Sequence, residues 1–152
     1  KELLKKNLHI FVGGKGASTK KIMPKTYEWL ESQEKKDNFF VISDLLSEAF
    51  AQFFCLGQKK NSVISLMAQH RRFLKESPFH PKALDEALSS LASCDKTWSF
   101  KTTGSGGEDA LLVFGDGSDI EEAKNLLESK GWKEEIWDLD EKGLSCFTSE
   151  EN

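Results

Sequence analysis

The sequence predicts an α+β domain in which helices cover one face of an antiparallel sheet. Three observations support this class. A short apolar run near the N-terminus stops at a glycine-rich segment, a long stretch with helical periodicity follows, and the rest alternates between strand-like and helical patterns. The 152 residues are enough for one domain with its own core, and we expect residues 1–152 to form that single domain.

The first half predicts one strand and four helices. Residues 8–12 (Leu-His-Ile-Phe-Val) should form a strand, because this mostly apolar run ends at the glycine-rich segment 13–16. The first helix should begin close to Pro24, since proline is tolerated in the first turn of a helix. Apolar residues at helical spacing predict three more helices, over 39–56, 62–75 and 81–92.

The second half predicts the remaining strands. Residues 97–102 alternate with period two, and 110–114 form a buried apolar strand. A helix that ends at Gly131 follows, and two final strands are expected at 132–139 and 144–147. The order β, four helices, β, β, α, β, β predicts a ferredoxin-like core whose first crossover is elaborated by extra helices.

Composition argues against several classes of protein. The 21 basic and 25 acidic residues give a net charge of −4, so we expect neither a nucleic-acid nor a membrane partner. The mean hydropathy is −0.48, and no apolar run near 18 residues predicts a spanning helix. No apolar leader follows Lys1, and Cys55, Cys94 and Cys146 form no paired motif. We therefore expect a cytoplasmic protein without a disulfide framework or metal site.

The sharpest functional signal is the glycine-rich stretch 101–107 (Lys-Thr-Thr-Gly-Ser-Gly-Gly) between two predicted strands. Successive amides in such a loop can hold a phosphate, although a plain hairpin connection is the alternative interpretation. A second segment, 13–19 (Gly-Gly-Lys-Gly-Ala-Ser-Thr), combines glycines, a lysine and a helix start. It suits an anion, and a capped helix start without any ligand is the alternative. No pattern for nucleophilic catalysis is present, so we assign no catalytic residue.

Together these two segments resemble the C-terminal domain of the GHMP small-molecule kinases, nearest to mevalonate and phosphomevalonate kinases. Residues 101–109 are similar to that family's third motif, K-x-(S/T)-G-(A/S)-G-G-G-(D/G), and 13–19 to its T-G-K-x-A-S-T segment. Glu108 is a departure, because the family usually has glycine there. The resemblance covers nearly the whole chain, and only the two loops are specific.

The resemblance implies part of an ATP-dependent kinase of isoprenoid biosynthesis that phosphorylates a small alcohol or phosphate acceptor. The residues expected to border the acceptor and the transferred phosphate are Thr103, Gly104, Ser105, Gly106 and Gly107, together with Ser18 and Thr19. ATP and Mg²⁺ would be bound mainly by an N-terminal domain that does not precede Lys1 here. We therefore expect no cofactor and no kinase activity for this chain alone, and possible self-association through the interface exposed without that domain. The alternative is a non-catalytic ferredoxin-like module that binds a ligand or a partner.

Overall fold

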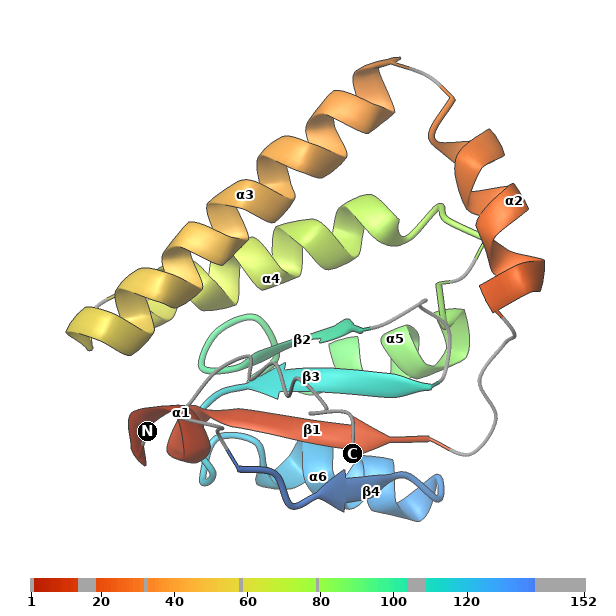
Figure 1. Cartoon of the computed structure of the whole chain (residues 1–152). Helices are drawn as coiled ribbons and strands as arrows, with labels where there is room; N and C mark the ends of the chain where they lie inside the picture. The colour runs from red at the N-terminus through yellow and green to blue at the C-terminus, as the bar shows by residue number, and fades with distance from the viewer. Residues whose placement is uncertain are drawn as a thin grey trace, which may run out of the picture.

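The computed structural model describes residues 2–13, 19–31, 33–57, 59–78, 80–103 and 109–138. Six helices and four strands lie within these residues (Figure 1). In chain order they are α1 (Glu2–Asn7), β1 (Leu8–Val12), α2 (Thr19–Trp29), α3 (Gln33–Leu56), α4 (Lys60–Leu74), α5 (Lys82–Ser89), β2 (Ser99–Thr102), β3 (Ala110–Phe114), α6 (Glu121–Ser129) and β4 (Lys133–Glu135).

The four strands form one sheet in the order β2-β3-β1-β4, and every neighbouring pair is antiparallel. The central pair, β1 and β3, is in register from Leu8 opposite Phe114 to Val12 opposite Ala110. This arrangement confirms the predicted α+β class with an antiparallel sheet.

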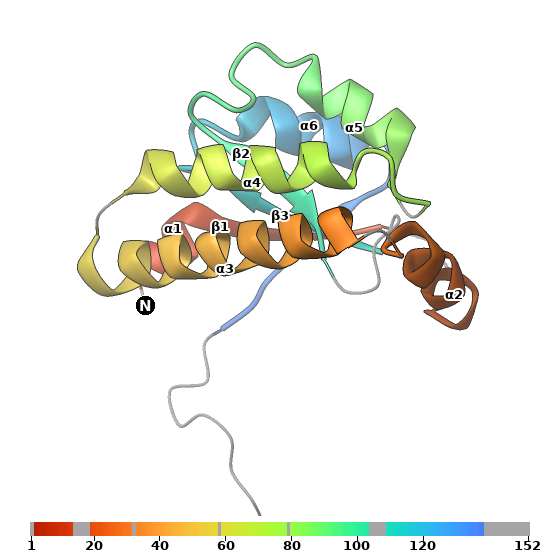
Figure 2. The same ribbon diagram turned by 90° about the horizontal axis from the view of Figure 1, so that it is seen from above.

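Helices cover both faces of the sheet, so the expectation that they cover one face is wrong. Phe11, Leu111 and Val113 pack with residues of α5 and α6 in one buried cluster. Phe114 lies in a second buried cluster with residues of α3 and α4, and Leu112 packs against its edge. Seen from above, α5 and α6 lie on one side of the sheet and α3 on the other, while α4 runs beside β2 (Figure 2). Successive side chains of a strand point to opposite faces of the sheet. Because the central strands are nearly continuous apolar runs, both of their faces are apolar.

Most predicted elements agree with the structure. The strands 8–12 and 110–114 are confirmed residue for residue, and four helices lie between β1 and β2 as expected. The last predicted strand, 144–147, lies outside the described residues. The strand expected at 132–139 is observed only from Lys133 to Glu135, where it pairs with the end of β1.

The start of α2 differs from the prediction. The helix begins at Thr19, and Pro24 lies inside it rather than in its first turn. Pro24 has no amide hydrogen, so the backbone hydrogen bond that this position would donate to the Lys20 carbonyl is missing. The amides of the first turn have no partner within the helix in any case, and Pro24 lies just beyond that turn. The helix continues past it, and the Thr26 hydroxyl donates to the Ile22 carbonyl at 3.1 Å. The short helix α1 was not predicted.

The expectation that no segment has the length and composition to cross a membrane is wrong for helix α3. Within Glu34–Leu56 the most apolar 18-residue window has a mean hydropathy of 1.6, although Asp44 and Glu48 interrupt the apolar run. In this fold α3 packs against α4 through Leu46, Ala49 and Phe53. Only 17% of its most apolar 18-residue window is buried inside the protein.

Gly115 directly follows β3 and is closely packed. A Cβ atom there would overlap the Cβ of Trp98 and lie 2.9 Å from Cγ2 of Ile120, and both of these side chains are fully buried. We expect Gly115→Ala to lower the free energy of unfolding by about 1–2 kcal/mol, because the neighbouring core must shift. Urea denaturation would measure this change.

Gly117 is the matched control for this substitution, because a Cβ atom there meets nothing within 4 Å. Gly117→Ala should leave the stability nearly unchanged. Equal effects of the two substitutions would contradict the close packing around Gly115.

Candidate functional site

The two glycine-rich segments leave the sheet next to each other. Val12, the last residue of β1, pairs with Ala110, the first residue of β3. Immediately beyond this pair, the Gly13 amide donates to the Asp109 carbonyl at 2.9 Å. Across the hairpin, the Thr103 amide donates to the Ala110 carbonyl at 3.1 Å. The flanks of both segments therefore meet at one end of the sheet, where β1 and β2 end and β3 begins (Figure 1).

Two of the predicted site residues lie within the described part of the chain. Thr103 directly follows β2, and Thr19 is the first residue of α2. Ser18 and the residues Gly104, Ser105, Gly106 and Gly107 lie outside the described residues, as does Glu108. The structure therefore shows the residues on either side of the loop 104–108, Thr103 and Asp109. It also shows helix α2, whose first residue is the last residue of the segment 13–19.

Lys101 is the charged residue of β2 at this end of the sheet. It pairs with Leu112 in the register of β2 and β3, and its side chain is partly buried. Burial lowers the pKa of its ammonium below the usual value. No carboxylate among the described residues forms an ion pair with Lys101.

His70, near the end of α4, is the electrostatic neighbour of Lys101. It is 6% exposed, and its Nδ1 atom has no hydrogen-bond partner among the described residues. Burial, with a further contribution from the positive charge of Lys101, lowers the pKa of His70 to about 4. The imidazole is therefore neutral at physiological pH.

A buried ion network contacts β2 through the ring of Phe100. Arg71 Nε lies 3.0 Å from Asp85 Oδ1, and Arg71 Nη2 lies 2.7 Å from Asp95 Oδ2. The guanidinium carbon also lies 4.1 Å from the centre of the Phe100 ring. Arg71 and Lys101 both line a cavity of about 10 Å³, about the size of one water molecule. Sequence reasoning missed this network, since no spacing rule connects these three charged residues.

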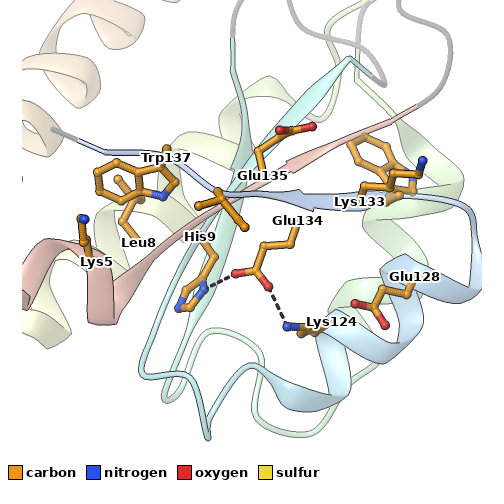
Figure 3. A pocket seen from close by; sticks show the side chains of 11 residues that line it. Lys5, Leu8, His9, Lys124, Glu128, Lys133, Glu134, Glu135 and Trp137 are labelled. Carbon is orange, nitrogen blue, oxygen red and sulfur yellow. Dashed lines mark hydrogen bonds and ion pairs between the residues drawn. The ribbon is translucent and has the colours of Figure 1, made fainter. Parts of the chain in front are cut away.

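A larger hollow lies elsewhere, along the β4 edge of the sheet. It has a volume of about 730 Å³ and contains the triad of His9, Glu134 and Lys124 (Figure 3). His9 Nδ1 lies 2.8 Å from one carboxylate oxygen of Glu134, and Lys124 Nζ lies 2.7 Å from the other. The triad cross-links β1, β4 and α6.

Lys124 and Glu134 stabilise each other's charged forms. Burial alone would raise the pKa of Glu134, but the hydrogen bonds from Lys124 and His9 outweigh it and lower that pKa. The hydrogen bond to Glu134 raises the pKa of Lys124. The charges of Lys124 and Glu134 therefore compensate each other.

In the described residues no three His, Cys, Asp or Glu side chains gather. No protein-family model, curated protein or solved structure matches this chain.

Proposed function

We propose that this chain is the C-terminal part of a cytoplasmic, ATP-dependent GHMP-type kinase. Its substrate would be a small alcohol or phosphate acceptor, with mevalonate and phosphomevalonate as the first candidates. The observation that carries the proposal is the hydrogen bond from Gly13 to Asp109. It joins the flanks of the two segments whose sequences resemble that family, although more than half of the chain separates them.

The sheet topology supports the finer fold assignment within this proposal. In the order β4-β1-β3-β2 the first and third strands are central, and helices connect β1 to β2 and β3 to β4. This is the arrangement expected of a ferredoxin-like core. Here α2–α5 would form the elaborated first crossover and α6 the second.

The chemistry proposed for this end of the sheet is positioning and charge stabilisation. Phosphoryl transfer depends mainly on aligning the groups and neutralising the oxygens of the transferred phosphate. Thr103 to Gly107, with Ser18 and Thr19, would border the place where acceptor and phosphate meet. ATP and Mg²⁺ would be bound mainly by the N-terminal domain of the same protein.

One exposed apolar residue beside the site, Val12, is consistent with a covering domain. Val12 directly precedes Gly13 and is 37% exposed, although it ends a strand whose other apolar residues are more buried. Without its partner domain, such a surface would also favour self-association of the chain.

The complete protein encoded by the gene provides the test. We expect it to transfer the terminal phosphate of ATP to mevalonate or phosphomevalonate, measured by release of ADP and by detection of the phosphorylated product. The 152-residue chain by itself should show no turnover. Replacing Thr103 with alanine in the complete protein should lower kcat/KM by roughly 10²-fold, as expected when one donor to a transferred group is lost.

Thr97 is the matched control, because it is exposed and precedes β2 on the side away from the glycine-rich loop. Thr97→Ala should leave kcat/KM unchanged. A complete protein that binds an acceptor but transfers no phosphate would overturn the proposal and favour a non-catalytic binding module. Turnover by the 152-residue chain alone would contradict the division of labour between two domains.

A further inference from the structure

Helix α3 carries apolar side chains on its outer face as well as on its inner face. The inner face packs in the buried cluster that also contains Phe114 and residues of α4. On the outer face, the side chains of Phe40, Val41 and Leu45 are each 47–56% exposed. Nine large apolar side chains are exposed in the described part of the chain, and four of them lie on this helix. Helix α3 therefore presents apolar surface that its own chain leaves half uncovered.

These exposed side chains belong to the N-terminal half of α3. In the C-terminal half, the rings of Phe50 and Phe53 contact Phe114 of β3, with centroids 5.4 and 5.0 Å apart. In the N-terminal half, Phe39 contacts α4 instead, and its ring centroid lies 6.4 Å from that of Phe73. Figure 1 shows α3 on the outside of the fold, beyond α4 as seen from the sheet. The outer side of this half is thus open to another molecule.

Two charged side chains flank Phe40 at equal distances along the helix. Lys36 precedes Phe40 by four residues, Asp44 follows it by four, and both are exposed. Residues four apart form one ridge on a helix surface, so this ridge presents a cation, an aromatic ring and an anion in turn. Its ends lie about 12 Å apart along the helix axis, which is too far for Lys36 and Asp44 to pair within one helix.

A twofold axis at Phe40 makes this ridge complementary to itself. Twofold symmetry places residue i of one copy against residue j of the other, and residue j against residue i. When two copies of α3 cross antiparallel with the axis at Phe40, Lys36 of each copy faces Asp44 of the other. The two Phe40 rings then meet at the axis, and Val41 and Leu45 of the adjacent ridge border the contact. Ridges of this spacing interdigitate when two helices cross at about −50°.

Other alignments and another occupant fit this face less well. A parallel pairing would place Lys36 against Lys36 and Asp44 against Asp44. A twofold axis at Val41 or Leu45 brings no opposite charges together along this helix. A lipid bilayer is also a poorer occupant, because the exposed carboxylates of Asp44 and Glu48 lie among the apolar side chains of this face and are costly to bring into lipid.

We propose that the outer face of α3 is a homodimer interface, on which a second copy of this chain packs antiparallel through the ridge of Lys36, Phe40 and Asp44. A standard stable interface buries about 800 Å² on each partner, and one helix face supplies less. The dimer should therefore be weak, with a Kd on the order of 10–100 μM. This inference is independent of the proposed function, because it uses neither glycine-rich segment.

Sedimentation equilibrium of the 152-residue chain, from about 5 to 500 μM, measures the association. Wild type should show a monomer–dimer equilibrium, and Phe40→Ser should weaken it at least roughly tenfold, because the ring at the axis is lost. Leu56→Ser is the matched control. Leu56 is exposed on the same helix but lies about 24 Å from the axis, so this variant should dimerise like wild type. Because these side chains are exposed, the melting temperatures should stay within about 2 °C of wild type.

Charge reversal distinguishes this pairing from general adhesion of apolar surface. Lys36→Asp and Asp44→Lys each place like charges in both symmetric contacts, so each should weaken the dimer roughly tenfold. The double variant Lys36→Asp, Asp44→Lys restores opposite charges and should return the Kd to within about threefold of wild type. This series also decides the question if Phe40→Ser fails to fold.

Several outcomes would overturn the proposal. These are a wild type that stays monomeric over the whole range, a dimer that folded Phe40→Ser leaves intact, or single charge reversals whose effect the double variant does not relieve. A dimer lost in Val12→Ser but kept in Phe40→Ser would assign self-association to the end of the sheet beside the glycine-rich segments. Flotation of a monomeric chain with phosphatidylcholine vesicles, abolished by Phe40→Ser, would assign the face to a lipid surface instead.

Discussion

Replacing Arg71 with methionine is expected to lower the free energy of unfolding by about 3–5 kcal/mol. Arg71 is buried, and its guanidinium forms ion pairs with Asp85 at 3.0 Å and with Asp95 at 2.7 Å. The side chain of Asp85 is also buried, so removing Arg71 leaves a carboxylate without its closest counter-charge. The contact of the guanidinium with the Phe100 ring is lost at the same time. Urea denaturation monitored by tryptophan fluorescence would measure the change.

The adjacent residue, Arg72, is the matched control. Its side chain is 65% exposed and contacts the same Asp95 carboxylate at 3.2 Å. Arg72→Met should therefore cost no more than about 1 kcal/mol. The double variant Arg71→Met, Asp85→Leu should recover part of the lost stability, because no buried charge is left unpaired. Equal costs for the two single arginine variants would contradict the role assigned to burial.

Lowering the pH from 7 to 4 is expected to destabilise the protein through His70. The pKa of His70 is lowered from 6.5 to about 4 in the folded state, so between these values the unfolded chain binds a proton that the folded protein does not. The contribution of neutral His70 to the free energy of unfolding is fully present above pH 6.5 and is lost as the pH decreases toward 4. The shift corresponds to about 2–3 kcal/mol after allowance for solvent screening.

A comparison of two pH profiles isolates this effect. His70→Gln removes the titrating group, so its unfolding free energy should fall less than that of wild type between pH 7 and 4. The difference between the two falls should be about 2–3 kcal/mol. His80, whose pKa burial also lowers, is present in both proteins and cancels from the difference. Parallel profiles for wild type and His70→Gln would show that His70 does not titrate in this way.

Local sequence predicted the secondary structure well where one pattern dominates. Strands β1 and β3 are apolar runs bounded by polar or glycine residues, and their limits were predicted exactly. The same runs contained a signal that the prediction did not use. Continuous apolar strands, unlike alternating ones, indicate burial on both faces, and both faces of this sheet are covered. The start of α2 was missed because a proline beyond the first turn costs a helix only one hydrogen bond, which the rest of the helix tolerates.

The candidate site was predicted less completely. The sequence identified the segments 13–19 and 101–107, and Lys101 entered only as the first residue of the second segment. Its burial and its lack of a carboxylate partner depend on how α4 and β2 pack together. The same holds for Arg71, whose partners Asp85 and Asp95 come from other parts of the chain.

The sequence by itself determined most of the segments that form strands and helices, because periodicity and glycine breaks are local properties of the chain. Only the tertiary structure decided that Gly13 and Asp109 meet at one end of the sheet, and that helices cover both of its faces. It also decided which charges are compensated. The energy of a charge depends on burial and on groups brought close by folding, and neither is encoded at any fixed spacing along the chain.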